Sequence, residues 1–445
     1  MTKVKISIIG AGSAVFSMSL VRDVCLTEGL KDSTICFMDI NKERLDTVYS
    51  LAKRYAQETK AKISFSKTLE RKEAFQDADF VINTALAGGH ERSEIERKVG
   101  EKHGYVSGGM RLSYFHQLGL MLSIAQDMED TCPDAWLILA ANPVFDGCTL
   151  MTRQTKIKVI GLCHGHYGVY DIARVLGLDR NKITFQAPGL NHCIWLTDFR
   201  YEGKDAYPLI DEWIETKAED YWKNWEGNWG DGQMSRAAVS LYKMFGLFPI
   251  GDTVQQNPTI AWWHYVDLET QKRWFNKYGG WPANWSNYLE GLKKHLERLD
   301  RIYRDSSMLV SKEFPPKLSG EQHIPIINAL VNDQEGKFQV NIPNRGCALE
   351  GIPSDVVVEV PGVVSGRGVQ AIHVGALPKH LAIHLLRTIV TRMELGLEAF
   401  LTGDKSILLN MVLSDHRTRS YEQAQALIED LLALPFNEDL KKKFK

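Results

Sequence analysis

The sequence VKISIIGAGS occupies residues 4–13 and joins a short apolar run to a glycine-rich turn. The Ile and Val residues before Gly10 are typical of a strand that is buried on both faces of a parallel sheet. A helix is expected to follow, because glycines at this point let the backbone approach the pyrophosphate of a dinucleotide at a helix N-terminus. The cofactor contacts predicted from this segment are Gly10, Gly12, Ser13 and Phe16.

Two alternatives remain for this turn. Val15 stands where the usual dinucleotide fingerprint has a third glycine, so an ordinary tight turn is one alternative. Lys3 and Lys5 before an apolar run also resemble the start of a secretion signal, but the glycine turn inside that run favours a strand, a turn and a helix. Asp39 ends the next predicted strand, where its carboxylate can accept hydrogen bonds from an adenosine ribose and repel a 2′-phosphate. We therefore predict NAD rather than NADP as the cofactor.

Strands and helices continue to alternate up to about residue 195. This alternation predicts an α/β fold with a doubly wound parallel sheet, whose ligands bind beyond the carboxyl ends of the strands. A long glycine-rich loop is expected before Phe115. The predicted strands are Thr34–Met38, Lys62–Phe65, Phe80–Thr84, Trp136–Ala140, Lys158–Leu162 and Ile194–Phe199, and the predicted helices are Asn41–Thr59, Leu69–Phe75, Phe115–Met128 and Val144–Gln154.

The remainder of the chain has a different character. Nine of the eleven tryptophans fall between residues 213 and 285, where they favour core or subunit packing, with sugar stacking as an alternative. Helical spacing follows at Asn287–Arg304, His380–Leu401 and Tyr421–Leu434, and Val and Glu alternate in Val356–Val360. We predict a nucleotide-binding domain over residues 1–195 and an α+β domain over residues 196–445 that binds substrate and forms a homodimer or homotetramer.

Composition restricts the class of partner. The 445 residues carry 53 Lys and Arg against 55 Asp and Glu, a formal net charge of −2. Because the charge is nearly balanced, we expect a small-molecule partner and neither a nucleic acid nor a membrane, and no run approaches the ~20 apolar residues that span a bilayer. The seven cysteines are odd in number and scattered, which favours a reducing compartment and hence the cytoplasm.

Polar side chains follow several of the predicted strands. Asn142 comes after Trp136–Ala140, although Asn-Pro is also ordinary turn chemistry. Cys163 and His192 lie at the ends of neighbouring strands, where a thiolate and an imidazole can hold one divalent metal and leave positions open for substrate oxygens. Taken singly, each is equally explained as a buried core residue. His164, next to Cys163, is placed to act as an acid or base on whatever the metal holds.

In this order the motifs resemble glycoside hydrolase family 4, and the resemblance covers the whole chain. They are Gly10-Ala11-Gly12-Ser13, Asn142-Pro143, Cys163-His164-Gly165 and Asn191-His192 with Trp195. The resemblance implies a Rossmann-like fold related to lactate and malate dehydrogenases, which lack the Cys-His and Asn-His pairs. It also implies a glycosidase that uses NAD⁺ and Mn²⁺, or another divalent metal such as Co²⁺, outside the usual two-carboxylate scheme.

The family's mechanism is oxidation of the sugar at carbon 3, loss of the proton at carbon 2, elimination of the aglycone, addition of water and re-reduction. By resemblance, Cys163 and His192 are metal ligands, Asn142 contacts sugar hydroxyls, and His164 protonates the departing oxygen. The preferred base is Asp252, with Tyr242 second and a metal-activated water third.

The motif Cys163-His164-Gly165 is similar to that of the α-glucuronidase group of this family. An α-galacturonidase or α-glucosidase of the same family is the alternative. A uronate needs a cationic partner, and Arg111 or Arg236 is predicted to supply it unless each is a surface salt-bridge residue. The alternative classes are an NAD-dependent dehydrogenase and a catalytically silent NAD-binding protein. The open metal site predicted at Cys163 and His192 argues against both.

Overall fold

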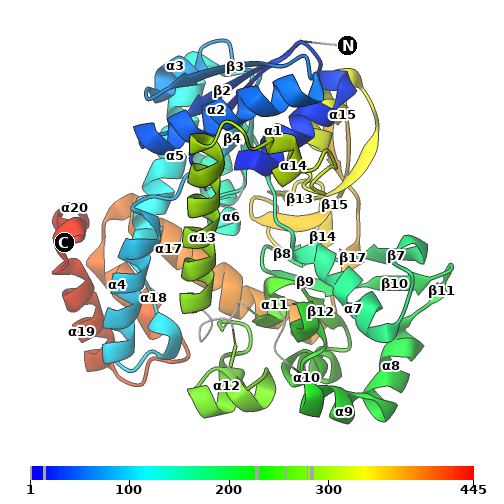
Figure 1. The fold of residues 1–445 in the computed structure, drawn as a ribbon. Coiled ribbons are helices and arrows are strands. Elements are labelled where there is room, and N and C mark those ends of the chain that lie inside the picture. Colours follow the sequence, from blue (N-terminus) through cyan, green and yellow to red (C-terminus); the bar gives the residue numbers. More distant parts are fainter. Residues whose placement is uncertain (1–2, 14–16, 226–229, 256–257, 278, 281–284) are drawn as a thin grey trace.

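The centre of the molecule is a mixed β-sheet surrounded by helices (Figure 1). The computed structural model describes residues 3–13, 17–225, 230–255, 258–277, 279–280 and 285–445. In this part of the chain the sheet has twelve strands, and six of them run parallel in the order β3-β2-β1-β4-β5-β6. This is the strand order of a doubly wound nucleotide-binding sheet, so the predicted α/β fold is confirmed. The parallel strands are β1 (Lys5–Ile9), β2 (Thr34–Met38), β3 (Ser64–Thr68), β4 (Phe80–Asn83), β5 (Trp136–Leu139) and β6 (Lys158–Gly161).

Beyond β6 the sheet continues into antiparallel strands that come largely from the second half of the chain. The strand predicted at Val356–Val360 is part of β15, which lies between β13 and β8 in this same sheet. Strands from both sides of residue 195 therefore share one sheet, and the division into two domains stays a prediction. The added strands are β8 (Gly189–Leu190), β9 (Cys193–Leu196), β12 (Phe248–Ile250), β13 (Gly336–Pro343), β15 (Val357–Ser365) and β16 (Gly368–Ala371).

The strand predicted at Ile194–Phe199 is two strands, β9 and β10 (Asp198–Tyr201). β9 belongs to the main sheet, whereas β10 pairs with β7 (Ile183–Gln186) and β11 (Lys204–Asp205) in a separate sheet. The polar pair Thr197 and Asp198 marks the division between the two strands in the sequence. A further short pair is formed by β14 (Leu349–Glu350) and β17 (Gly375–Ala376).

The helices of the first half cover the parallel strands, and most begin within a few residues of their predicted positions. Their buried side chains form apolar clusters with those of the strands. These helices are α1 (Ser17–Leu26), α2 (Lys42–Thr59), α3 (Arg71–Phe75), α4 (Gly89–Lys102), α5 (Ser113–Thr131), α6 (Val144–Gln154) and α7 (Gly168–Leu176).

Helix α4 corrects the sequence analysis, which placed a loop here. The buried residues of α4 are Glu96 and Gly100, so no apolar stripe at helical spacing marks it. A Cβ on Gly100 would lie 1.9 Å from the carbonyl oxygen of Gly108, so the helix is packed against the segment that follows it. Glu96 accepts hydrogen bonds from the Ser113 backbone N–H (2.9 Å) and the Asn437 side chain (3.0 Å). Tertiary contacts of this kind leave no periodic signal in the sequence.

The second half is mainly helical. The helix predicted at His380–Leu401 is divided into α16 and α17 by a π-helical turn at Leu386–Val390. Helix α13 begins close to its predicted start and contacts α2 near its own C-terminal end, where Arg54 of α2 donates to the carbonyl oxygen of Ile302 (2.7 Å) (Figure 1). The helices are α8 (Tyr207–Thr216), α9 (Ala218–Asn224), α10 (Arg236–Phe245), α11 (Asp252–Gln255), α12 (Leu268–Trp274), α13 (Trp285–Arg304), α14 (Val310–Glu313), α15 (His323–Asn332), α16 (Lys379–Leu385), α17 (Thr391–Thr402), α18 (Lys405–Leu413), α19 (Tyr421–Leu432) and α20 (Glu438–Lys443).

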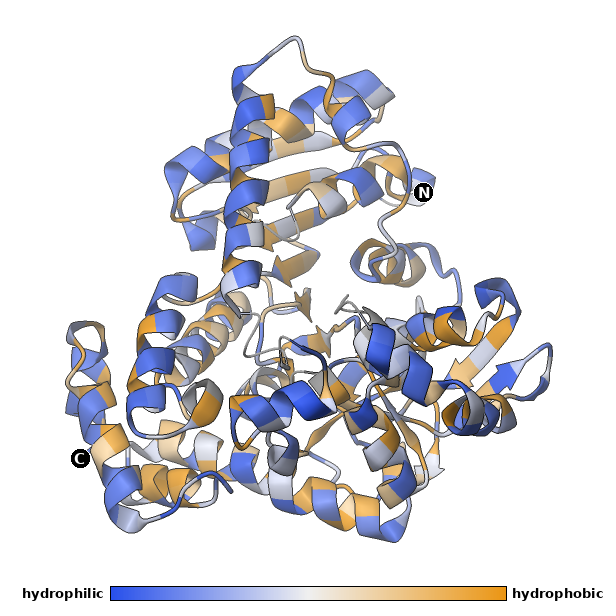
Figure 2. Ribbon diagram, turned by 60° about the horizontal axis from the view of Figure 1, so that its bottom comes forward, coloured by the Kyte–Doolittle hydropathy of each residue, from blue (hydrophilic) through white to orange (hydrophobic). Residues whose placement is uncertain are grey.

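Apolar side chains are concentrated on the strands and on the helix faces turned toward them (Figure 2). Within the Trp-rich segment, Trp213 is buried, and the indole of Trp222 donates to the carbonyl oxygen of Met234 (2.8 Å). These contacts agree with a packing role for part of that segment. Among the described residues, no helix combines the length and apolar character needed to cross a membrane.

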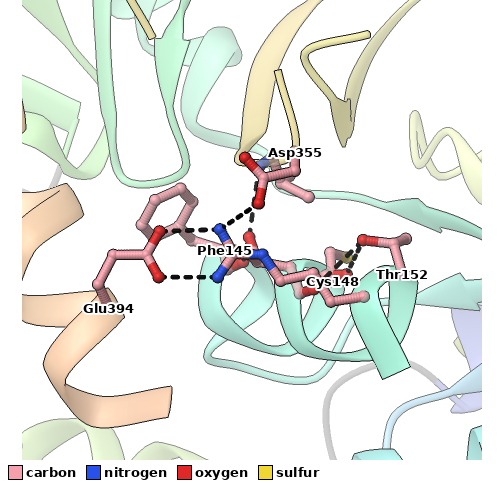
Figure 3. Close-up of polar contacts among 8 residues, drawn as sticks. Phe145, Cys148, Thr152, Asp355 and Glu394 are labelled. Atoms are coloured by element: carbon pink, nitrogen blue, oxygen red, sulfur yellow. Dashed lines mark hydrogen bonds and ion pairs between the residues drawn. The ribbon is translucent and has the colours of Figure 1, made fainter. Parts of the chain in front are cut away.

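An arginine joins the two halves of the chain near the sheet (Figure 3). Arg153, in the last turn of α6, makes two parallel hydrogen bonds of 2.8 Å to Glu394 on α17. Its Nη2 also lies 2.8 Å from Asp355, just before β15. A bidentate arginine–carboxylate pair fixes orientation as well as distance. The pair thus fixes α17, which contains Arg392, relative to α6, the helix that follows Asn142.

Candidate active site

The glycine turn after β1 is closely packed. Gly10 has φ of +77°, and a Cβ there would lie 2.6 Å from the Ala85 backbone. A Cβ on Gly12 would lie 2.7 Å from Arg44 Cβ. Only glycine fits at either position. Because no side chain is present there, the end of the strand stays open to the phosphates of a ligand. The Ser13 N–H donates to the Gly10 carbonyl oxygen (3.0 Å), whereas Phe16 lies outside the described residues.

Asp39 lies beside this turn, as predicted. Its Oδ2 accepts a hydrogen bond from the Gly12 N–H (2.8 Å), and its Oδ1 accepts one from the Asn41 N–H (2.8 Å). Each carboxylate oxygen has a second lone pair, so these bonds hold the side chain in place and still allow it to accept from a ribose. The next side chain, Ile40, is 88% exposed. The sequence analysis did not single out Ile40, although an apolar residue directly after a strand-end aspartate is a visible signal.

Three side chains that could hold a metal ion, here called the metal-binding trio, meet at the carboxyl end of the sheet. Cys163 follows β6, His192 lies between β8 and β9, and Asp252 begins α11 directly after β12. Asp252 Oδ2 is 3.2 Å from His192 Nε2 and 3.9 Å from Cys163 Sγ. One donor atom from each residue lies within 4.8 Å of the other two, and no other His, Cys, Asp or Glu trio in the described ranges meets this condition. The structure therefore brings the predicted base together with the two predicted ligands.

Glycines and one strained residue bring the trio together. A Cβ on Gly251 would lie 2.4 Å from the Gly165 carbonyl oxygen, and φ of Gly251 is +63°, so this close approach requires glycine. The approach places the loop after β12 against the loop after β6. His192 occupies the left-handed region at φ of +57°, which a non-glycine residue adopts at a cost of about 1 kcal/mol or more. Strain of this kind is concentrated at functional sites.

The donor set fits a divalent transition metal. Burial raises the pKa of the Cys163 thiol well above its usual value, and the carboxylates of Glu359 and Asp252 raise it further. A thiolate is costly here unless a cation stabilises it. Thiolate, imidazole and carboxylate together suit a divalent metal of the first transition row. Three protein ligands would leave coordination positions for substrate oxygens, as in catalytic rather than structural sites.

The trio lines a cavity of about 940 Å³, large enough for a sugar and part of its aglycone. Three further predicted site residues, Asn142, His164 and Arg111, line the same cavity. Asn142 lies shortly after β5, and the peptide bond between Asn142 and Pro143 is cis. The cavity brings together residues that are far apart in the chain, since Cys163 and Asp252 are separated by 89 positions.

His164 has a fixed partner. Its Nδ1 lies 3.2 Å from Glu321 Oε1, and hydrogen bonding to that carboxylate raises the pKa of His164. Glu321 is held in turn, because its backbone N–H donates to Ser319 Oγ (3.0 Å) and the Ser319 N–H donates to Asp23 (2.7 Å). An imidazole that is stabilised in its protonated form is suited to protonate a departing oxygen.

Two residues considered in the sequence analysis are not brought to this cavity. Arg236 pairs with Glu219 (3.3 Å) and lies over the Trp222 ring, so it is a salt-bridge residue and not a substrate contact. The hydroxyl of Tyr242 donates to Asp211 (2.9 Å), and Tyr242 is not among the residues that line the cavity. No pattern in the sequence indicates which way either side chain faces.

Sequence analysis missed most of the positive charge in the cavity. Arg97, Arg392 and Arg417 line it together with Arg111. Arg417 forms an ion pair with Asp415 (2.6 Å), and Arg97 forms one with Glu94 (2.7 Å). Within the described residues, neither Arg111 nor Arg392 forms an ion pair with a carboxylate, and Arg392 donates to Thr259 Oγ1 (3.3 Å). Burial lowers the pKa of Arg111, and the neighbouring arginines lower it further against the opposing effect of Glu96. The cavity lining thus carries four arginines together with the carboxylates of Asp146, Asp171, Asp252 and Glu321.

Comparisons with known proteins agree with this geometry. The chain is 26% identical over 443 residues to an α-galactosidase of Bacillus subtilis (strain 168), covering 97% of this chain and 96% of that protein. It is 27% identical over 459 residues to an α-galacturonidase of Lachnoclostridium phytofermentans, covering 96% and 95% of the two chains.

The fold is also that of solved structures. A 6-phospho-α-glucosidase from gut microorganisms, in complex with NAD and Mn²⁺, has a TM-score of 0.80 at 17% identity and covers 99% of both chains. A lactate dehydrogenase of Eimeria maxima has a TM-score of 0.53 at 13% identity over 90% of this chain and 98% of that one. The model of the family 4 glycosyl hydrolases matches residues 5–178, and that of their C-terminal domain matches residues 187–418. The chain therefore belongs to family 4 of the glycosyl hydrolases.

Proposed function

We propose that this glycosyl hydrolase is an NAD⁺- and divalent-metal-dependent α-glucuronidase. The observation that carries the proposal is the presence of Arg111 and Arg392 in the cavity that also contains Cys163, His192 and Asp252. A guanidinium matches a carboxylate in shape and charge, and two of them without a carboxylate partner favour an anionic substrate. Glu96 acts electrostatically on Arg111, and Asp146 and Asp415 interact in the same way with Arg392. None of these carboxylates forms an ion pair with either guanidinium, so both remain available to a carboxylate of the substrate.

The cofactors would be held at two places, the glycine turn after β1 and the metal-binding trio. Gly10, Gly12 and Ser13 would hold the pyrophosphate of NAD⁺, Asp39 its adenosine ribose, and the exposed Ile40 one face of its adenine. Cys163 and His192 would hold the metal, with Asp252 in reach as a third ligand. When bound, NAD⁺ and the metal supply reversible oxidation at sugar carbon 3 and polarisation of the oxygen on that carbon.

The remaining steps fall to side chains of the cavity. Asn142 orients the sugar hydroxyls through its amide. Asp252 is our preferred base for the proton at carbon 2, because its carboxylate faces the metal side of the cavity and Tyr242 lies elsewhere. His164, held through Nδ1 by Glu321, protonates the glycosidic oxygen as the aglycone departs.

The position after His164 also supports a role in sugar selection. A Cβ on Gly165 would lie 3.9 Å from both Cys163 Sγ and the Asp252 backbone nitrogen. A larger side chain there would extend toward the metal-binding trio and take space from the sugar. Glycine leaves that space open, as expected for a substrate with a bulky and charged carbon 6.

An α-galacturonidase is the second candidate. It is favoured by the names of relatives such as the α-galacturonidase of Lachnoclostridium phytofermentans. A galacturonide has the same carboxylate as a glucuronide, so the arginines serve either sugar, and the two differ only at the hydroxyl on carbon 4. A cytoplasmic homo-oligomer remains our proposal for its setting, supported by the seven free cysteines, one of which must stay reduced to bind metal.

A panel of para-nitrophenyl glycosides tests the proposed function. With NAD⁺, Mn²⁺ and a reducing agent, we expect turnover of the α-glucuronide, slower turnover of the α-galacturonide and little of the neutral α-glucoside. Phenol release without accumulation of NADH is the expected result, because the oxidation at carbon 3 is reversed in each cycle. Faster turnover of the galacturonide would select the second candidate, and steady NADH formation would contradict a glycosidase.

The arginines give a prediction about selectivity. Replacing Arg111 or Arg392 by glutamine is expected to lower kcat/KM for the α-glucuronide about 10- to 100-fold, the usual effect of losing a hydrogen bond to a charged group. The neutral uronamide should be affected less than about threefold, because it offers no charge to bind. Arg236→Gln is the control, since this residue pairs with Glu219 outside the cavity. Equal losses of kcat/KM on the α-glucuronide and the uronamide would indicate that the two arginines stabilise the fold and do not bind the carboxylate.

A further inference from the structure

A fully buried carboxylate lies next to the metal-binding trio. Glu359 on β15 is 0% exposed, and its backbone is paired with Gly189 of β8 on one side and Asn341 of β13 on the other. This position is inside the main sheet, where a charged side chain is costly unless it is paired. Glu359 therefore needs a physical explanation.

The hydrogen bonds of Glu359 only partly offset the cost of burying its charge. Oε2 accepts from the side-chain amides of Asn191 (2.9 Å) and Asn341 (3.3 Å). Oε1 has no hydrogen-bond partner, and within the described residues no Lys, Arg or His forms an ion pair with this carboxylate. Burial raises the pKa of Glu359, against the opposing effects of Asn191 and of His192. Two neutral amides do not balance a buried negative charge.

The network leads directly to the metal-binding trio. The amide of Asn191 that donates to Glu359 also acts on Cys163, where it lowers the pKa of the thiol against the effect of burial. Asn191 is the residue before His192 in the turn between β8 and β9, so its position also fixes the backbone of that ligand. Carboxylates that contact metal ligands through one intermediate group orient the ligands and add attraction for the cation.

We propose that Glu359 is a positioning residue that strengthens metal binding by Cys163, His192 and Asp252 and makes the metal-free protein less stable. A divalent cation at the trio supplies the positive charge that the interior lacks. Without the cation, Glu359 has only the amides of Asn191 and Asn341 as hydrogen-bond donors, and the carboxylate of Asp252 further disfavours its charged form. The inference rests on the proposed metal site and not on the identity of the sugar.

The test measures Mn²⁺ affinity by calorimetry and the Tm of the metal-free protein, in the full chain and in Glu359→Gln. Glutamine keeps the shape and the hydrogen bonds but removes the charge. We expect Mn²⁺ to bind about 10- to 100-fold more weakly, and the metal-free variant to have a Tm equal to or above that of the parent. Glu359→Asp, which keeps the charge, should retain more of the affinity than Glu359→Gln.

Glu96→Gln is a matched control, because Glu96 is equally buried but is bonded to Ser113 and Asn437 away from the trio. Its Mn²⁺ affinity should equal that of the parent. Unchanged Mn²⁺ affinity in Glu359→Gln, or a metal-free variant that is less stable than the parent or does not fold, would overturn the inference. A parent chain that itself binds no divalent metal would instead refute the metal site of the proposed function.

Discussion

Replacing Cys163 by serine is expected to reduce metal-dependent turnover more than about 100-fold, while NAD⁺ still binds. Changing a residue that only supports a metal ligand already costs about 10- to 100-fold in affinity or activity, so losing a ligand should cost more. The thiol is half-buried with Asp252 Oδ2 3.9 Å from its sulfur, and a serine hydroxyl in the same place is a much weaker ligand. The glycine turn after β1 is separate from this cluster, so its cofactor contacts should be unaffected.

The measurement combines kcat with Mn²⁺ present, Mn²⁺ affinity and NAD⁺ affinity from quenching of tryptophan fluorescence. Cys132→Ser is the control, since this cysteine is also buried but lies at the end of α5 and does not line the cavity. It should retain parental turnover. If Cys163→Ser kept turnover within about tenfold of the parent, or if chelation left the parent active, the assignment of Cys163 as a metal ligand would be wrong.

Asp252→Asn is expected to lower kcat about 10²- to 10⁴-fold, the usual effect of removing a group that transfers a proton in the transition state. If Asp252 is the base, the variant should also lose exchange of the substrate's carbon 2 hydrogen with deuterated water. Asparagine keeps an oxygen near His192 and Cys163, so Mn²⁺ affinity should fall less than turnover does.

The control for this prediction is Tyr242→Phe, because the phenol donates to Asp211 outside the cavity. We expect parental kcat and parental exchange at carbon 2. Loss of exchange in Tyr242→Phe, with exchange retained in Asp252→Asn, would reverse the assignment of the base. A loss of Mn²⁺ affinity in Asp252→Asn as large as the loss of turnover would make Asp252 mainly a ligand.

The sequence was sufficient to predict the parallel half of the sheet. Continuous apolar runs such as Val4–Ile9 mark strands buried on both faces, and the turn after them requires glycines for steric reasons that are local to the chain. The positions of Cys163, His164 and His192 directly after, or between, strands also follow from local pattern. Cys163 and His164 lie at this edge because the parallel strand β6 ends there. His192 reaches it from the turn between the antiparallel strands β8 and β9, so the prediction that Cys163 and His192 follow neighbouring strands is wrong: β13, β15 and β8 separate β6 from β9.

Other features depend on contacts that no local pattern contains. Helix α4 buries Glu96 and Gly100 instead of an apolar stripe, and β15 joins the main sheet although its alternation fits a separate one equally well. Asp252 reaches Cys163 because Gly251 allows two loops to touch. The position of Arg392 in the cavity depends on the packing of α17 against α6, which the bond between Arg153 and Glu394 fixes.

The sequence by itself therefore determined the nucleotide-binding sheet and the chemical nature of its strand-end residues, because hydrophobic period and turn sterics act over a few neighbouring positions. The tertiary structure alone decided which of the acidic and cationic residues share the cavity. Side chains such as Cys163 and Asp252, 89 positions apart, meet only when the packing of the whole sheet brings their loops into contact.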